Sequence, residues 1–468
     1  MNKQNQISEE KVKEKIYEIF IKPTINRKQD YIGVEIEIPI TNLENKPVNF
    51  QIVHKVTKEF LKKFPNFTYQ EKDQKGNINL AINKKTKDII SYDCSYNNLE
   101  FSMGKETNLF EIKKRFCTYY NSIKKIFEKY NHTLTGMGVN PHYKINKNIP
   151  IPNERYLMLY HHLNSYTNYD KTIKFHNHPE YGTFSSASQV QLDVNYNDLI
   201  ETINTFNLVE PIKAILFSNS ILLKENENLI CSRDMLWEYS THGINPHNIG
   251  MFKENLTNIN DLINYLSSLD IYCVKRGNLY INFRTMNILD YFKSDKIIGE
   301  YQNKGEYAKI EIKPEIEDVK YLRSFKFENL TYRGTIEYRS VCTQPMNEIM
   351  TVSAFHLGLK HQLKELKELL NNDTIIYNRG YNATELRKML IHNNIPGFIN
   401  EEGIYKLTRN VLDLAKKGLE LRGNGEEIFL NPLYERISKK TNPAKTILKL
   451  KNEGTSLNKI IKKYGFVN

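Results

Sequence analysis

The chain has 468 residues, of which 40% are hydrophobic and 26% are charged. This composition is typical of a folded globular protein and excludes collagen-like, coiled-coil and largely disordered chains. Lysine and arginine total 66 against 54 acidic residues, a net charge of +12 that raises the question of nucleic acid or another anionic partner.

Targeting signals and cysteine spacing indicate the compartment. The sequence has no run of about 18 apolar residues, and Met1–Lys15 lacks the apolar core of a secretory signal. We therefore expect a cytoplasmic protein without a membrane partner. The five cysteines are scattered and form no CxxC pair, which favours reduced thiols over disulfides or a zinc site. They are Cys94, Cys117, Cys231, Cys273 and Cys342.

Strand and helix periods alternate along the chain. In chain order, the spacing of apolar residues predicts a strand over Tyr31–Ile40, a helix over Phe50–Phe64, a strand over Asn97–Met103, a helix over Leu109–Tyr130, strands over Ser188–Val194 and Thr335–Val341, and helices over Met350–Leu370 and Tyr405–Leu421. From Pro443 onward, two short basic helices are predicted on either side of Gly454. No repeat or Pro-, Gly- or Ser-rich tract divides the chain, so we expect one main domain over residues 1–468 with a helical tail over about 434–468.

Each predicted strand has one apolar and one polar face. In Tyr31–Ile40, the aliphatic side chains point one way and Glu35 and Glu37 point the other. The polar faces of the other three strands carry Glu100, Gln189, Gln191, Asp193, Glu337 and Arg339. This alternation predicts an α+β fold built on an antiparallel sheet with one polar face. Any one strand alone fits a solvated face, but acids two residues apart gain nothing from one another on a surface, so convergence on cations explains them better.

The polar face suggests phosphoryl transfer. Carboxylate and amide oxygens are the ligands that Mg²⁺ takes, together with substrate phosphates. An arginine beside an acid, such as Arg339 beside Glu337, can stabilise the charge that develops on a transferred phosphoryl group. The sequence has no GxxxxGK[ST] loop and no kinase glycine loop, so metals and side chains would have to hold the phosphates of a nucleotide.

Seven motifs occur in an order that matches a known family. They are Gly33-Val34-Glu35-Ile36-Glu37; Asp93 with Glu100; Pro152 with Arg155 and Tyr156; Ser188–Asp193; Phe217–Ser220 with Ser232, Arg233 and Trp237; Gly334–Arg339; and Gly418–Gly423 with Leu430, Pro432 and Leu433. Together they resemble the plant-type and proteobacterial glutamate–cysteine ligases, which belong to the carboxylate–amine ligase superfamily related to glutamine synthetase. The resemblance runs through most of the chain.

The resemblance implies a saddle-like antiparallel sheet, open as a funnel, with helices on its outer face and ATP and more than one Mg²⁺ on its inner face. In the implied reaction, the γ-carboxylate of glutamate attacks the γ-phosphate of ATP, and the amine of cysteine then displaces phosphate from the acyl phosphate to form γ-glutamylcysteine. The implied metal shell is Glu35, Glu37, Asp93, Glu100, Gln191 and Glu337. Arg339 would stabilise the transferred phosphate beside Glu337, and the substrate-binding residues would be Arg233, Arg155, Gln189 and Trp237.

Departures from the family pattern leave the substrates open. Gln191 stands where the family usually has Asn or His, the segment 156–162 departs from the family's usual run after Arg-Tyr, and the region 244–303 matches little of the family. The alternative is a ligase that joins glutamate, or another carboxylate, to a different amine. The oligomeric state is not fixed by the sequence.

Other groups of residues suggest other functions, but with weaker support. His176 and His178 could bind zinc, but no third ligand lies at a natural spacing. His161 and His162 are predicted to be a pair on a helix surface. Ser185, Ser186 and Ser188 lack the GxSxG context of a hydrolase and are interpreted as a turn before a strand. A nucleic-acid-binding protein that uses the C-terminal lysines is the rival from another class, but the tyrosines are spread through apolar segments instead of clustering with arginine.

Overall fold

The computed structural model describes residues 7–27, 30–303 and 305–467, so residues 1–6 of the polar N-terminal stretch lie outside it. At its centre is a nine-stranded sheet in the order β14-β15-β7-β1-β5-β4-β3-β2, with β6 paired to β1. Its pairings are antiparallel, as the sequence predicts. The strands are β1 (Ile32–Asn42), β2 (Phe67–Lys72), β3 (Ile78–Asn83), β4 (Ile89–Tyr92), β5 (Asn98–Glu106), β6 (His132–Leu134), β7 (Ser188–Asp193), β14 (Glu328–Leu330) and β15 (Thr335–Tyr338).

The four predicted strands are β1, β5, β7 and β15, and they lie side by side at the centre of the sheet. β15 ends at Tyr338 instead of Val341, although the amide of Arg339 still donates to the carbonyl of Phe327 at 2.9 Å, one residue beyond the last pair of β14 and β15. Arg339 therefore follows the strand, whereas Glu337 lies within it.

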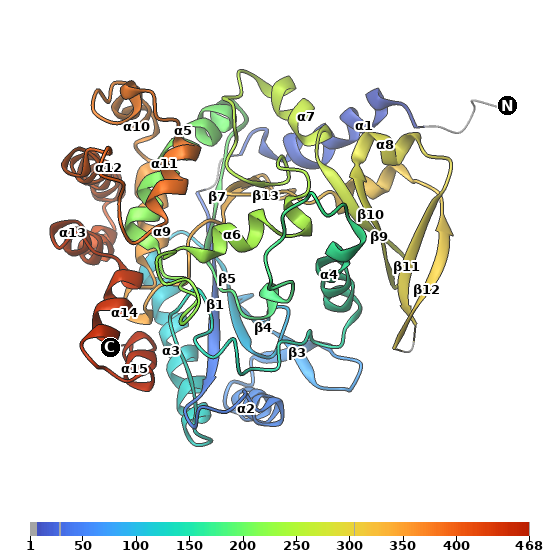
Figure 1. The fold of residues 1–468 in the computed structure, drawn as a ribbon, viewed down its shortest axis with the longest axis horizontal. Helices are drawn as coiled ribbons and strands as arrows, with labels where there is room; N and C mark the ends of the chain where they lie inside the picture. The colour runs from blue at the N-terminus through green and yellow to red at the C-terminus, as the bar shows by residue number, and fades with distance from the viewer. Residues whose placement is uncertain (1–6, 28–29, 304, 468) are drawn as a thin grey trace.

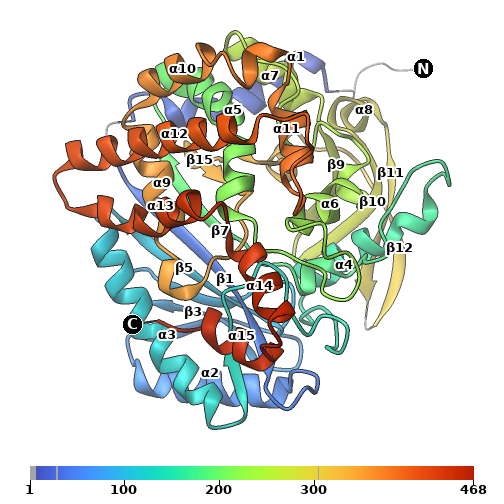
Figure 2. The ribbon, with the colours of Figure 1, turned by 60° about the vertical axis from the view of Figure 1, so that its left-hand side comes forward.

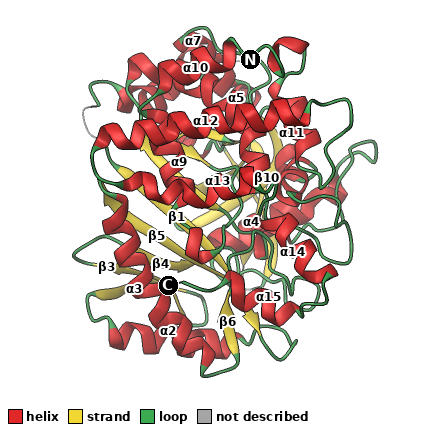
Figure 3. Cartoon of the chain, turned by 90° about the vertical axis from the view of Figure 1, so that its left-hand side faces the viewer, coloured by secondary structure: helices red, strands yellow, loops and turns green. Residues whose placement is uncertain are grey.

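A layer of helices covers one face of the central sheet (Figures 1 and 3). In chain order these are α2 (Phe50–Lys63), α3 (Leu109–Glu128), α5 (Leu199–Phe217), α9 (Thr351–Lys360), α10 (Leu363–Asn371), α11 (Ala383–Leu390), α12 (Glu401–Arg422) and α13 (Asn431–Ser438). The single helix predicted over Met350–Leu370 is wrong. The chain turns at His361 and Gln362, which lets α9 pack on the sheet and α10 pack on α5 and α12.

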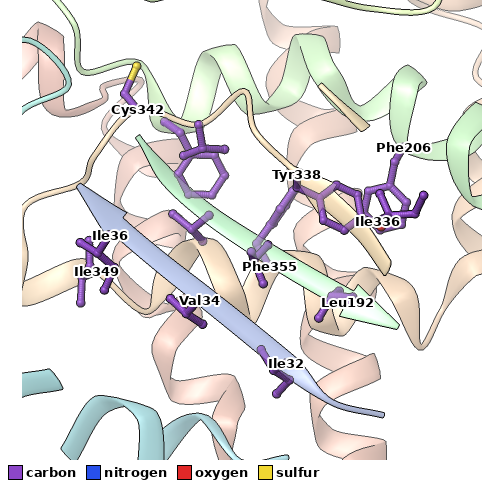
Figure 4. Close-up of a cluster of buried hydrophobic side chains, with 14 of the residues drawn as sticks. Ile32, Val34, Ile36, Leu192, Phe206, Ile336, Tyr338, Cys342, Ile349 and Phe355 are labelled. Carbon is purple, nitrogen blue, oxygen red and sulfur yellow. The ribbon is translucent and has the colours of Figure 1, made fainter. Parts of the chain in front are cut away.

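The core lies between this sheet face and the helices. Figure 4 shows Ile32, Val34 and Ile36 of β1 in the same cluster as Phe206 of α5 and Phe355 of α9. Each is almost completely buried, and burying one such side chain is worth about 1.5–3 kcal/mol. The alternation that fills this core fixes the orientation of the strands, so their polar residues point to the opposite side.

The C-terminal segment ends in two short helices, α14 (Pro443–Asn452) and α15 (Leu457–Tyr464), on either side of Gly454 as predicted. Their buried residues Ile447, Leu448, Ile460 and Ile461 pack with Met137, Ile221 and Ile230 in a small cluster apart from the main core. α14 and α15 lie side by side (Figure 2), and α15 packs beside β6 (Figure 3). Among the described residues, no helix combines the length and apolar character needed to cross a membrane.

Further elements stand on the other side of the central sheet (Figure 1). A second, four-stranded antiparallel sheet contains β9 (Asp270–Arg276), β10 (Leu279–Asn287), β11 (Ile297–Asn303) and β12 (Glu306–Ile312). With it lie α1 (Glu9–Ile16), α4 (Glu154–Asn164), α6 (Ser232–Glu238), α7 (Ile259–Ser267), α8 (Ile288–Lys293) and the short parallel pair β8 (Ile249–Gly250) and β13 (Phe325–Lys326). The segment 244–303, which matches little of the family, builds much of this side.

The structure places the two histidine pairs that the sequence analysis names. His161 is partly exposed on α4, but His162 is 3% exposed and stacks on Tyr272 of β9 at 3.8 Å between ring centroids. The prediction of a surface pair is therefore wrong for His162, because the second sheet covers that face of α4. His176 and His178 lie in a loop, where His176 contacts the carbonyl of Leu236 through Nε2.

Candidate active site

The acids of the central strands lie together on the sheet face opposite the core. Glu37 of β1 is paired with Glu100 of β5, Glu35 of β1 with Gln189 of β7, and Glu337 of β15 with Gln191 of β7. Directly opposed residues of antiparallel strands point to the same side. The register therefore brings four carboxylates and two amides from four adjacent strands onto one surface.

Gln191 links two of these carboxylates. Its Nε2 donates to Glu35 Oε1 at 3.0 Å and to Glu337 Oε1 at 2.8 Å. Its Oε1 accepts from Arg333 Nη1 at 3.2 Å and from Thr335 Oγ1 at 3.4 Å. In this arrangement Gln191 is a bridge between acids, and its side chain would have to turn before the oxygen could serve the predicted metal shell.

Glu37 is held by two donors from the start of β7. Its Oε2 accepts from the amide of Ala187 at 2.7 Å, and its Oε1 accepts from Gln189 Nε2 at 2.9 Å. Burial, followed by repulsion from Asp93, raises the pKa of Glu37 well above its usual value, and the nearby Arg233 opposes the shift. Gln189 Oε1 is buried without a hydrogen-bond partner. Glu37 and Gln189 are thus fixed in place, and the Oε1 atom of Gln189 is left without a hydrogen-bond partner.

Asp93 and Glu100 complete the acidic cluster at its other end. Asp93 follows β4, and Glu100 Oε1 accepts from Ser102 Oγ at 2.6 Å. Burial and the neighbouring Asp93 raise the pKa of Glu100 to about 7, while the exposed Arg155 lowers it. Burial also raises the pKa of Asp93, against the pull of Arg155 and Arg339. Arg155 therefore acts electrostatically on both acids.

Two further arginines and the tryptophan flank the cluster. Arg339 forms an ion pair with Glu337 through Nη1. Arg233, at the start of α6, is 7% exposed; its Nη1 donates to the carbonyl of Ser340 at 3.3 Å, and its Nε is buried without a partner. Trp237, one turn further along α6, packs on Tyr181. A buried guanidinium with an unused donor is suited to an anionic ligand.

The clustered acids destabilise one another's ionised forms. Burial, followed by repulsion from Glu337 and Glu100, raises the pKa of Glu35 to about 8, and Arg339 and Arg333 reduce the shift. Like charges in a poorly solvated site have this effect. A bound cation would relieve the repulsion.

The donor set fits hard divalent cations, although the acids do not form a finished cage. Among residues 7–27, 30–303 and 305–467, no three His, Cys, Asp or Glu side chains converge closely enough to hold a metal ion by themselves. The carboxylates are instead spaced by Gln191, Gln189 and Arg339. Mg²⁺ is usually held by one or two carboxylates plus phosphate oxygens and water, so this open arrangement of oxygens suits it better than an all-protein cage would.

Stability should depend on pH through Glu35. Its folded pKa of about 8 exceeds the unfolded value of about 4.3, so the folded state binds the proton more tightly. Below about pH 4, Glu35 is protonated in both states and does not lower the free energy of unfolding. As pH rises from about 4 to about 8, the free energy of unfolding falls, because the buried carboxyl must stay protonated or ionise at a cost. Above about pH 8 there is no further loss. We expect Glu35→Gln to melt higher than the wild type at pH 8 in EDTA, with the difference vanishing near pH 4.

The measurement is thermal unfolding of both proteins across this pH range, in EDTA and in Mg²⁺. Mg²⁺ should raise the wild-type melting temperature at pH 8, because a ligand that binds only the folded state stabilises it. Equal melting temperatures for the two proteins at pH 8 in EDTA would contradict the assigned repulsion.

The structure adds residues that the sequence patterns do not single out. Arg333 lies in the turn before β15, and only its place two residues before Thr335 hints that it reaches Gln191. Cys231 and Cys342 are free thiols with their sulfur atoms 3.6 Å apart, although 111 residues separate them in sequence. Long-range packing brings these groups to the site, so no local spacing reveals them.

Two surface hollows lie elsewhere on the molecule. One, of about 650 Å³, is lined by residues of α1 and α7, and the other, of about 460 Å³, by residues around α10 and α12. Both are wide open, and neither includes the acids of the central sheet. The chemistry of the side chains therefore locates the candidate site better than surface shape does.

Comparison with known proteins gives relatives of one kind. No family model matches the chain. The chloroplastic glutamate–cysteine ligase of Nicotiana tabacum is 23% identical over 351 residues, which cover 71% of this chain and 61% of that protein. The Arabidopsis thaliana enzyme is 23% identical over 362 residues, covering 72% and 62%.

A solved structure of the glutamate–cysteine ligase of Francisella tularensis, in complex with AMP, aligns over 94% of this chain and 89% of that chain, with a TM-score of 0.49 and 11% identity. The chain spans a little over 60% of the length of the plant relatives that it matches. By these sequence matches, the chain is distantly similar to plant glutamate–cysteine ligases.

Proposed function

We propose that the protein is an ATP-dependent ligase that joins the γ-carboxylate of glutamate to the amine of cysteine. The observation that carries the proposal is the row of carboxylates and amides across β15, β7, β1 and β5, with Arg339 and Arg233 beside it. Sequence similarity to the plant glutamate–cysteine ligases supports the choice of reaction.

The acids would bind Mg²⁺ and, through it, the phosphates of ATP. Glu35, Glu37 and Glu100 would supply carboxylate oxygens, with Asp93 and Glu337 at the two ends of the row. When bound, Mg²⁺ would neutralise charge on the phosphates and hold the γ-phosphate in line for attack. The fit rests on the oxygen donors and on the raised pKa values, which a cation would lower.

The two arginines would act on different parts of the reaction. Arg339 would stabilise negative charge on the γ-phosphoryl group as it passes to the substrate carboxylate. Arg233 would bind a substrate carboxylate, since its Nε is buried and unpartnered. The acyl phosphate formed by this transfer has phosphate as a good leaving group, which the amine displaces to make the amide.

The second candidate is a ligase of the same mechanism with a different amine or carboxylate. The observation that favours it is the aromatic cluster beside Arg339. In this cluster His242 stacks on Trp237 at 5.3 Å between ring centroids and meets Phe325 in a tilted contact at 4.3 Å. Burial, reinforced by Arg339, lowers the pKa of His242 to about 3, so this imidazole is neutral. A neutral aromatic wall could select an acceptor other than cysteine.

The proposal is tested by ADP release from the purified chain with Mg²⁺, ATP and glutamate, against a panel of amines led by cysteine and with product masses recorded. We expect release that requires both glutamate and cysteine and a product of dipeptide mass. Release with another pair would retain the reaction class and change the substrate. No amine-dependent release, together with steeply salt-dependent binding of DNA or RNA, would favour the nucleic-acid rival instead.

A further inference from the structure

A buried network of charges lies behind the two arginines of the candidate site. Arg387 of α11 is 3% exposed and donates to both oxygens of Asp234 on α6, from Nε at 2.7 Å and from Nη2 at 3.0 Å. Its Nη1 donates to the carbonyl and to Oε2 of Glu210 on α5, each at 2.8 Å. The guanidinium also lies over the ring of Phe327, 4.5 Å from its centroid. Arg387 thus fastens α6 to α5.

The network continues to the site through Ser340. Glu210 Oε1 accepts from Ser340 Oγ at 3.1 Å, and the Ser340 carbonyl accepts from Arg233 Nη1 at 3.3 Å. Asp234 is the neighbour of Arg233 on α6, and Ser340 is the neighbour of Arg339. α6, which carries Arg233, is therefore bonded to Arg387 through Asp234. The segment after β15, which carries Arg339, is bonded to Arg387 through Ser340 and Glu210.

We propose that Arg387 is a positioning residue, which holds α6 and the segment after β15 so that the Arg233 guanidinium faces the acidic cluster. The inference rests on the proposed function only for its kinetic readout. A bidentate pair fixes direction as well as distance, which a point charge such as lysine does not. Arg387 makes no contact with the acids of the sheet in this structure, so its influence passes through Asp234, Glu210 and Ser340.

The test compares Arg387→Lys with Arg233→Lys and with a matched control. Arg276 at the end of β9 makes a similar two-point pair with Asp318, which lies in a 3-10 turn after the second sheet, with Nη1–Oδ1 2.5 Å and Nη2–Oδ2 2.7 Å. Arg276→Lys therefore loses equivalent geometry elsewhere in the molecule. We expect Arg387→Lys to raise the KM of the same substrate as Arg233→Lys, by about tenfold, with kcat within about twofold of wild type. Arg276→Lys should leave both constants unchanged.

Trp237 supplies a readout that needs no turnover. It is the single tryptophan of the chain and lies on α6 one turn from Arg233, so its fluorescence reports the position of that helix. We expect a shifted emission spectrum for Arg387→Lys and a wild-type spectrum for Arg276→Lys. Unchanged emission and unchanged KM values in Arg387→Lys, at whatever melting temperature, would overturn the inference.

The inference stays testable if Arg387→Lys does not fold or if the wild type has no ligase activity. If Arg387→Lys does not fold, Asp234→Asn breaks the same pair from the other side, leaves Arg387 bonded to Glu210 and is judged by the same measurements. If the wild type shows no ligase activity, the proposed function fails, and the Trp237 spectrum alone decides whether Arg387 positions α6.

Discussion

Replacing Glu35 with glutamine should lower kcat by about a thousandfold while leaving the protein folded, and Glu337→Gln should do the same. Each change keeps the shape of the side chain and removes a carboxylate that a bound Mg²⁺ would hold in its ionised form. Groups that stabilise charge in a transition state typically contribute two to three orders of magnitude in kcat. Rates of ADP release at saturating ATP and Mg²⁺, with melting temperatures, provide the measurement.

Glu311→Gln is the control for this prediction. Glu311 lies on β12, a strand of the second sheet, and is exposed beside Lys296. Its substitution removes one strand glutamate without touching the central row, so kcat should stay at the wild-type value. A wild-type rate in both Glu35→Gln and Glu337→Gln would show that the polar face of the central sheet takes no part in the reaction.

Arg339→Lys should lower kcat by about a thousandfold with a smaller change in the KM for ATP. The guanidinium is paired with Glu337 and lies near Glu35 and Glu37, where the transferred phosphate would gain charge. An arginine that stabilises phosphoryl transfer contributes about 10³–10⁵ in kcat, and lysine does not reproduce its fork of donors. Steady-state kinetics with varied ATP separate the two constants.

Arg115→Lys is the matched comparison for Arg339. Arg115 is a largely buried arginine of α3 that bonds Asp88 and the carbonyl of Gly104, away from the acidic row. Loss of its guanidinium hydrogen bonds should lower the free energy of unfolding but leave kcat unchanged. If the two variants were equally active, Arg339 would be a structural residue and not a catalytic one.

The strand alternation made the central sheet predictable. From Ile32 to Ile40, aliphatic residues occupy every second position. A one-residue slip would expose all of them, so the outward direction of Glu35 and Glu37 follows from burial. The order of strands did not follow, because the pairing of Glu35 with Gln189 and of Glu337 with Gln191 joins segments more than 140 residues apart. Family resemblance, not local pattern, suggested that they meet.

Other features depended on tertiary packing that a local pattern does not encode. His162 was expected on a helix surface, but the second sheet buries it. Gln191 stays a predicted metal ligand, and only the structure shows that its amide nitrogen donates to both Glu35 and Glu337. The sequence does not distinguish Arg387 from a solvated arginine on an amphipathic helix, because its partners lie on α5 and α6, far away in the chain.

The most direct test of the proposed ligase mechanism follows the oxygen atoms of the γ-carboxylate into the released phosphate. Glutamate labelled with ¹⁸O in its γ-carboxylate is supplied with ATP, Mg²⁺ and the amine that supports ADP release, and the mass of the released phosphate is measured. Because the carboxylate attacks the γ-phosphate and the amine later expels phosphate from the carbonyl carbon, we predict that one ¹⁸O atom moves to each phosphate. Released phosphate without ¹⁸O would show that water, and not the carboxylate, attacks ATP, and would contradict the ligase mechanism.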